Sequence, residues 1–156
     1  MIPFENQPPT YWATTLYKDP RRRPKADAPI RDLPQRAAQR FKRAREGICA
    51  LKHVTEQVVF MGTTWKWVWM YEVAGRKLGY LHPMELSVSG TFVLTEFEER
   101  ELALSDGLPK PIRGAIRDGA IASGVRWCWV QFPDLDAVDA FVEIVRLKHM
   151  LLARPE

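Results

Sequence analysis

The stretch from Trp65 to Val73 constrains the fold more than any other part of this chain. Aromatic side chains occupy alternate positions in it, at Trp65, Trp67, Trp69 and Tyr71. Because successive side chains of a β-strand point to opposite faces, this alternation predicts a strand with one aromatic face. A second copy of the pattern, Arg126-Trp127-Cys128-Trp129-Val130, follows about sixty residues later. Five of the six tryptophans are therefore assigned to two predicted strands.

The length and composition of the chain indicate one globular domain. A chain of 156 residues can bury a substantial core, and two domains would be cramped in it. Its 46% hydrophobic and 27% charged residues are ordinary for a soluble protein. No apolar run reaches the roughly 18 to 20 residues that cross a bilayer, and the first residues lack the order of a secretory signal. The expected location is therefore cytoplasmic.

The two cysteines, Cys49 and Cys128, give no sign of a disulfide framework or of a metal site. They are far apart in sequence, and neither belongs to a C-x-x-C motif of the kind that binds zinc. We therefore expect no metal and no cofactor. Cys128, in the middle of a predicted strand, is interpreted as an inert buried thiol.

The first 33 residues are predicted to form a proline-rich, basic arm ahead of a single α+β domain at residues 34–156. Seven of the twelve prolines lie within residues 1–34, and each restricts its own backbone and that of the preceding residue. Tyr11 and Trp12 are expected to dock this extended arm onto the domain. Residues 1–60 contain 12 basic and 6 acidic residues, whereas residues 61–156 contain 11 and 13. The basic character therefore belongs to the N-terminal part.

The order of the predicted elements indicates an α+β fold. A first helix is expected to begin near Asp32 as N-cap and to continue to about residue 54, and the other helices are expected at residues 95–104, 109–122 and from Asp134 onward. Strands are expected at residues 65–73, 76–82, 88–94 and 125–132. Because the strands are joined by a hairpin and short loops, the prediction is a mainly antiparallel sheet of about four strands with helices packed across it.

The hairpin at Ala74-Gly75 also suggests a register for the first two strands. A tight turn there places Trp67 opposite His82, Trp69 opposite Tyr80, and Tyr71 opposite Leu78. The same register places Glu72 opposite Lys77, an oppositely charged pair that supports it. The prediction is therefore a continuous aromatic face across both strands.

Several short motifs resemble a bacterial family, the domain of unknown function numbered 3788. They are Gly62-Thr63-Thr64-Trp65-Lys66-Trp67, the basic turn Gly75-Arg76-Lys77, Leu81-His82-Pro83, Arg126-Trp127 and Leu147-Lys148. The likeness covers about residues 35–150 and extends, more distantly, to small YdhG-like α+β domains. This chain departs from the pattern at Thr64, where such families often have glycine. The resemblance implies the fold and implies no activity.

The aromatic face has three interpretations. It is the helix-covered core, the lining of a ligand cleft, or a surface for homodimerisation through the sheet. The cleft hypothesis assigns ligand binding to seven residues: Trp67, Trp69, Tyr71, Tyr80, His82, Trp127 and Trp129. The ligand is expected to be a small planar or apolar molecule, with His82 supplying a polar contact.

Two alternatives come from other functional classes. His82 with nearby Glu85 suggests general-base catalysis, but no nucleophile motif accompanies the pair, so no catalytic residue is assigned and enzymatic activity stays open. The basic arm and first helix suggest nonspecific nucleic-acid binding. That interpretation is the less favoured one, because arginines opposite an apolar helical stripe are usually the helix's solvated side.

Overall fold

The chain folds around a six-stranded antiparallel sheet. The structure is a computed structural model that describes residues 9–104 and 107–152. The strand order across the sheet is β1-β2-β3-β4-β6-β5, and every neighbouring pair is antiparallel. The strands are β1 (Thr55–Phe60), β2 (Trp67–Val73), β3 (Arg76–Pro83), β4 (Val88–Leu94), β5 (Ala120–Ala122) and β6 (Val125–Gln131).

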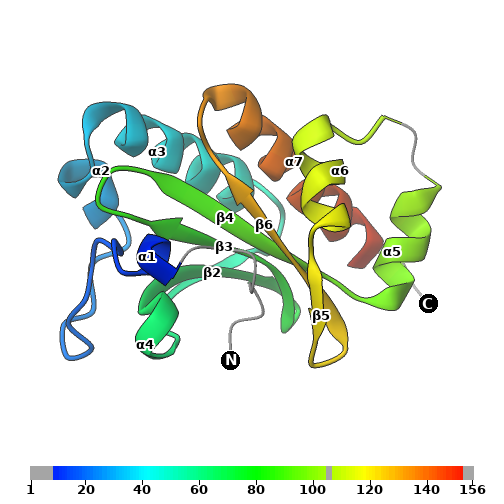
Figure 1. Cartoon of the computed structure of the whole chain (residues 1–156). Helices are drawn as coiled ribbons and strands as arrows, with labels where there is room; N and C mark the ends of the chain where they lie inside the picture. Colours follow the sequence, from blue (N-terminus) through cyan, green and yellow to red (C-terminus); the bar gives the residue numbers. More distant parts are fainter. Residues whose placement is uncertain (1–8, 105–106, 153–156) are drawn as a thin grey trace.

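The longer helices cover one face of the sheet, and two short helices lie against the other. In Figure 1, α3 (Gln35–Cys49), α6 (Lys110–Arg117) and α7 (Leu135–Leu152) lie above the sheet, and α5 (Glu96–Ala103) lies at its right-hand end. Below the sheet lie α1 (Pro9–Trp12) and α4 (Gly62–Trp65), whereas α2 (Ala28–Asp32) precedes α3. The α+β class is therefore confirmed.

The main core lies between the sheet and the long helices. Phe41 of α3 and Phe141 of α7 are fully buried, and Phe41 meets Trp69 of β2 edge to face at 5.5 Å between ring centroids. Phe141 packs in the same way on Phe132, which follows β6, at 5.3 Å. Large aromatic side chains thus fill the space between the two layers.

The sheet has six strands where about four were expected, because two segments predicted as helix end in strands. The first long helix ends at Cys49, and His53 then adopts a positive φ of 64°, which turns the chain into β1. The helix predicted for residues 109–122 ends at Arg117. A Cβ on Gly119 would lie 2.7 Å from the Trp127 carbonyl oxygen, so glycine lets the chain approach β6 and form β5.

The predicted hairpin register is correct at the turn and wrong beyond it. Glu72 pairs with Lys77, and their side chains form an ion pair of 2.6 Å. A β-bulge then inserts Leu78, so that Tyr71 lies opposite Gly79 and Trp69 lies opposite Leu81. Because a shift of one residue moves side chains to the opposite face, the predicted pairing of Tyr80 with Trp69, and of His82 with Trp67, does not form.

The N-terminal arm, as far as it is described, packs onto the domain and contains two short helices. Asp32 ends α2 instead of capping the next helix, and the position before α3 is taken by Pro34. Thr15 forms a β-bridge with Met84 at the end of the β3 strand. Trp12 is 5% exposed beneath the sheet, as the expected docking of this residue requires.

Of the three helix N-caps expected from the sequence, those at Thr95 and Asp134 are confirmed and the one at Asp32 is wrong. Thr95 and Glu98 form a complete capping box at the start of α5. Asp134 accepts a hydrogen bond of 2.9 Å from the backbone N–H of Ala137 and so caps α7. This second cap holds the short segment between the end of β6 at Gln131 and the start of α7 at Leu135.

Candidate functional site

The seven residues of the predicted aromatic cleft lie on two different faces of the sheet. Trp69 and Tyr71 have no exposed surface and belong to the helix-covered core. Trp67, on the same face, is 6% exposed, and its indole donates a hydrogen bond of 2.7 Å to the Asp19 carbonyl oxygen of the arm. The Trp69 indole donates similarly to the Ala26 carbonyl oxygen at 2.9 Å. These three side chains pack the protein's own interior.

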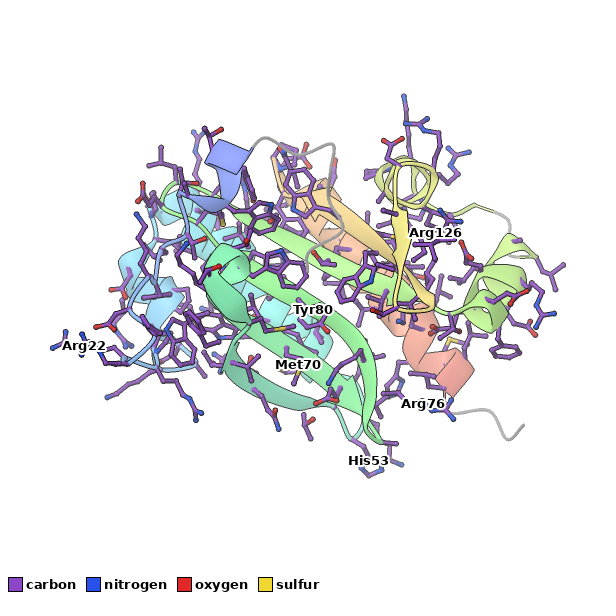
Figure 2. All side chains as sticks on the ribbon, turned by 60° about the horizontal axis from the view of Figure 1, so that its bottom comes forward. Arg22, His53, Met70, Arg76, Tyr80 and Arg126 are labelled. Carbon is purple, nitrogen blue, oxygen red and sulfur yellow. The ribbon has the colours of Figure 1, made fainter. Side chains whose placement is uncertain are left out.

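Tyr80 and His82 lie on the other face, in a second aromatic cluster. In Figure 2, Tyr80 and Met70 are labelled on neighbouring strands of the face that has been turned forward. The second cluster consists of Trp12, Trp65, Val68, Met70, Tyr80, Met84 and Val93, with Trp127 and Trp129 packed against it. Strand β2 begins at Trp67, two residues later than predicted, and Lys66 before it has a positive φ. Trp65 therefore lies outside the strand, and its side chain packs in the second cluster.

His82 is enclosed by this cluster. It is 2% exposed, and its ring lies 4.6 Å from the Trp65 ring and 5.0 Å from the Trp12 ring. Burial lowers the pKa of His82 to about 3, so the imidazole is neutral at physiological pH. Glu85, the acid suggested as its partner, instead pairs on the surface with Lys18 at 2.8 Å. The His82–Glu85 base is therefore not assembled.

Trp127 and Trp129 differ from the other five because they lie on β6, near the edge of the sheet: Trp127 pairs with Ala120 of β5, and Trp129 lies past the end of that pairing. They are partly buried side chains of β6, whose outer neighbour β5 pairs only with residues 125–127. Past the end of β5, a cavity of about 500 Å³ opens alongside β6. It is lined by both tryptophans together with residues of α6 and of the segment that starts α7. Neither this cavity nor the one between α5 and α6 described below is lined by Trp67, Trp69 or Tyr71.

The cavity beside β6, called here the β6 cavity, has an acidic rim. Asp118, Asp134 and Asp136 all line it, and the described residues that line it include no lysine or arginine. Arg117 donates to Asp118 at 3.1 Å and lowers the pKa of that carboxyl, which is therefore ionised at neutral pH. Asp134 is held in place because it caps α7. The two tryptophans that contribute to this lining also pack into the second cluster, Trp127 on Tyr80 and Trp129 on Tyr11 and Trp12. The charge of Asp118 is paired with Arg117, so Asp134 and Asp136 supply the unpaired negative charge of the rim.

Part of this site can be predicted from the sequence. Trp127 and Trp129 were found by their alternation, and Asp134 was identified as a helix cap only. Asp134 lies three residues after the strand that contains Trp127 and Trp129, and this closeness in sequence predicts that it lies near Trp129. Asp118 and Asp136 carry no such signal, because they reach the cavity through the packing of α6 and α7 against the edge of the sheet.

Outside the β6 cavity, we considered the buried thiol of Cys128 and possible metal-binding groups of acidic, histidine and cysteine side chains. Burial raises the pKa of the Cys128 thiol to about 12, in keeping with an unreactive core cysteine. Within residues 9–104 and 107–152, no group of three or more His, Cys, Asp or Glu side chains is arranged to hold a metal ion. In the same part of the chain, no helix combines the length and apolar character needed to span a membrane.

The basic side chains of α3 are largely occupied by contacts within the protein. The contacts are Arg43 with Asp139 at 2.8 Å, Arg45 with Glu56 at 2.8 Å, and Arg40 with the Phe132 carbonyl oxygen at 3.2 Å. In the arm, by contrast, residues 21–23 and Lys25 are exposed. Figure 2 shows Arg22 projecting away from the body of the molecule.

Comparison with known proteins finds no match for this chain. No family model, no curated protein and no solved structure matches it. The resemblance to the domain of unknown function numbered 3788 therefore stays a prediction.

Proposed function

We propose that this protein binds a small planar molecule carrying a positive charge in the β6 cavity. The observation that carries the proposal is the meeting of two partly buried tryptophans with three aspartates around one cavity of about 500 Å³. Ligand sites in proteins typically enclose about 300 to 1,000 Å³ and combine apolar walls with a few polar groups. The β6 cavity has this size and this composition.

The chemistry of the lining selects the class of ligand. Trp127 and Trp129 offer aromatic surface to a flat ring, and an indole also attracts a cation that lies over its face. Asp134 and Asp136, which have no ion-pair partner among the described residues, then favour a protonated amine or amidinium over a carboxylate, because like charges repel. Trp127 keeps a fixed orientation, since its indole N–H donates to the Ala122 carbonyl oxygen at 3.1 Å and its ring stacks on Tyr80.

The test follows the indole N–H signals of the six tryptophans by two-dimensional ¹H–¹⁵N NMR. Each signal is assigned from a Trp→Phe variant. The intact protein is then titrated with matched planar probes: benzamidine, benzamide and benzoate. We expect benzamidine to shift the signals of Trp127 and Trp129 first, with benzamide weaker and benzoate without effect. The signals of Trp67 and Trp69 serve as internal controls, because they lie on the other face.

A matched pair of variants separates charge from shape. Asp136→Asn should weaken benzamidine binding about three- to fivefold and leave benzamide binding unchanged, as expected for a partly exposed ion pair. Asp139→Asn, on the same helix but paired with Arg43, is the control and should change neither. Shifts confined to other indoles, or equal responses to benzamidine and benzoate, would contradict the proposal.

The alternative of nonspecific nucleic-acid binding now depends on the arm, where residues 21–23 and Lys25 are exposed. Arg21 lies 3.8 Å from Asp19, whereas Arg22, Arg23 and Lys25 have no ion-pair partner among the described residues. This alternative requires binding to duplex that weakens steeply with added salt. A gel shift with nonspecific duplex at low salt tests it, and Arg22→Gln together with Arg23→Gln should then abolish the shift. Binding unaffected by these changes would dismiss the arm as the contact.

A further inference from the structure

A second cavity, independent of the one just discussed, lies between α5 and α6. It has a volume of about 400 Å³ and is called here the α5–α6 cavity. Its apolar lining consists of Leu94, Leu102, Ala103, Leu108 and Ile116. Figure 1 shows these two helices side by side at one end of the sheet, where β4 leads into α5. Leu104, which follows Ala103 directly, is 81% exposed, so the apolar surface continues past the lining.

Three charged side chains, Glu99, Arg113 and Arg117, also line the α5–α6 cavity. Two of them form ion pairs with other residues of the protein. Glu99 is neutralised by an ion pair with Arg126, and Arg117 is engaged by Asp118. Arg113 has no ion-pair partner among the described residues and is exposed to solvent. An apolar cavity is thus bordered by a guanidinium group that is free to bind an anion.

Helix α6 separates this cavity from the acidic one. Its residues Pro111, Gly114 and Ala115, with Asp118 directly after its last residue, line the β6 cavity at the spacing of one helical face. Arg113, Ile116 and Arg117 are also spaced as one face, and they line the α5–α6 cavity. The same short helix therefore presents carboxylate chemistry to one cavity and guanidinium chemistry to the other, which implies ligands of opposite charge.

We propose that the α5–α6 cavity binds the monomeric form of a medium- or long-chain carboxylate. The alkyl chain lies among the leucines and Ile116, and the carboxylate accepts hydrogen bonds from the Arg113 guanidinium. Arginine suits this task because its planar fork matches the two oxygens of a carboxylate. Burial of the chain supplies most of the affinity, since each methylene removed from water adds to it.

The test is isothermal titration calorimetry of the intact protein with octanoate, decanoate and dodecanoate below their micelle concentrations. Each additional pair of methylenes should tighten binding by roughly tenfold until the cavity is filled. Dodecanol and dodecyltrimethylammonium serve as the neutral and cationic probes. We expect dodecanol to bind more weakly than dodecanoate, and the cation to bind least.

Variants locate the binding in the α5–α6 cavity. Arg113→Gln should weaken dodecanoate binding about fivefold or more and leave dodecanol binding unchanged. Arg100→Gln removes an exposed arginine of α5 that does not line the cavity, and it should change neither. Ile116→Phe should fill the cavity and weaken both probes. Equal effects of the two arginine changes, equal binding of anionic and cationic probes, or binding to phosphatidylglycerol vesicles without binding to monomeric dodecanoate would overturn the proposal.

Discussion

At the scale of single residues, His82 combines a titratable ring with an environment that resists its protonation. Its Nε2 atom lies 2.8 Å from the Thr91 hydroxyl, whereas Nδ1 is buried without a hydrogen-bond partner among the described residues. Its ring neighbours include Trp12 and Trp65, and no carboxylate of the described residues is placed to stabilise an imidazolium. Protonation of His82 in the folded protein would therefore leave a positive charge without compensation.

This environment predicts that His82 makes the protein sensitive to acid. The pKa of His82 is about 3 in the folded protein and about 6.5 in the unfolded chain, so below pH 6.5 only the unfolded chain takes up the proton. Stability is thus lost as the pH falls from about 6.5 toward 3. Over that whole window the loss from this one group is about 5 kcal/mol.

His82→Gln removes the titration and keeps a side chain that can bond to Thr91. We expect its free energy of unfolding, measured by urea denaturation, to fall about 2 to 3 kcal/mol less than that of the parent between pH 6.5 and 4.5. His53→Asn, which removes an exposed histidine and suits the positive φ there, should follow the parent curve. Parallel curves for His82→Gln and the parent would refute the assignment.

At the scale of elements, the arm is held to the sheet by two tryptophans that were predicted to bind a ligand. The indoles of Trp67 and Trp69 donate to carbonyl oxygens of Asp19 and Ala26, at the two ends of the exposed basic segment. Within the arm, Tyr17 donates a hydrogen bond of 2.8 Å to Asp32, the last residue of α2. The aromatic face of β2 thus fastens the arm in addition to filling the core.

Loss of either indole bond should release the basic segment. Trp67→Phe and Trp69→Phe each retain an aromatic ring and lose one hydrogen bond, worth about 1 kcal/mol. Cleavage of the native protein by trypsin after Arg21 and Arg22 should accelerate roughly fivefold in each variant, because cleavage follows the population of the opened segment. Trp127→Phe loses an indole bond outside the arm and is the control. Unchanged cleavage in the first two variants would contradict this role.

The same elements show what the sequence could and could not predict. Alternating side chains identified β2 and β6, and cap residues identified the start of α5 and α7, because these signals are local. No local sequence pattern predicts the bulge at Leu78. The next residue, Gly79, packs closely on β4, since a Cβ there would lie 2.9 Å from the Thr91 carbonyl oxygen. Strand β1 was missed because the helix before it was expected to continue to about residue 54. Strand β5 was missed because its three residues, Ala120–Ala122, were assigned to the end of a predicted helix. The acidic rim of the β6 cavity was missed because Asp118 and Asp136 come together only through the packing of α6 and α7 at the edge of the sheet.

At the scale of the whole molecule, a buried ion pair joins the helical layer to the sheet. Lys148 of α7 has no exposed surface, and its ammonium group donates to the carbonyl oxygens of Lys77 and Val93, on β3 and β4. It also lies 3.4 Å from Glu98 of α5. Burial lowers the pKa of Lys148, and the Glu98 carboxylate opposes that effect. One side chain therefore connects two strands and two helices.

This connection predicts strong energetic coupling between Lys148 and Glu98. Lys148→Met leaves the Glu98 carboxylate buried without its counter-ion and should lower the free energy of unfolding by about 3 to 5 kcal/mol. Glu98→Gln keeps an acceptor for the Thr95 N–H, so the capping box survives. The double variant should be more stable than the sum of the single changes implies, by at least about 1 kcal/mol in urea denaturation. Glu96→Gln, an exposed residue of the same helix, should combine additively with Lys148→Met. Additivity for Glu98 as well would mean that the two layers are held together by apolar packing and that the buried charges contribute independently.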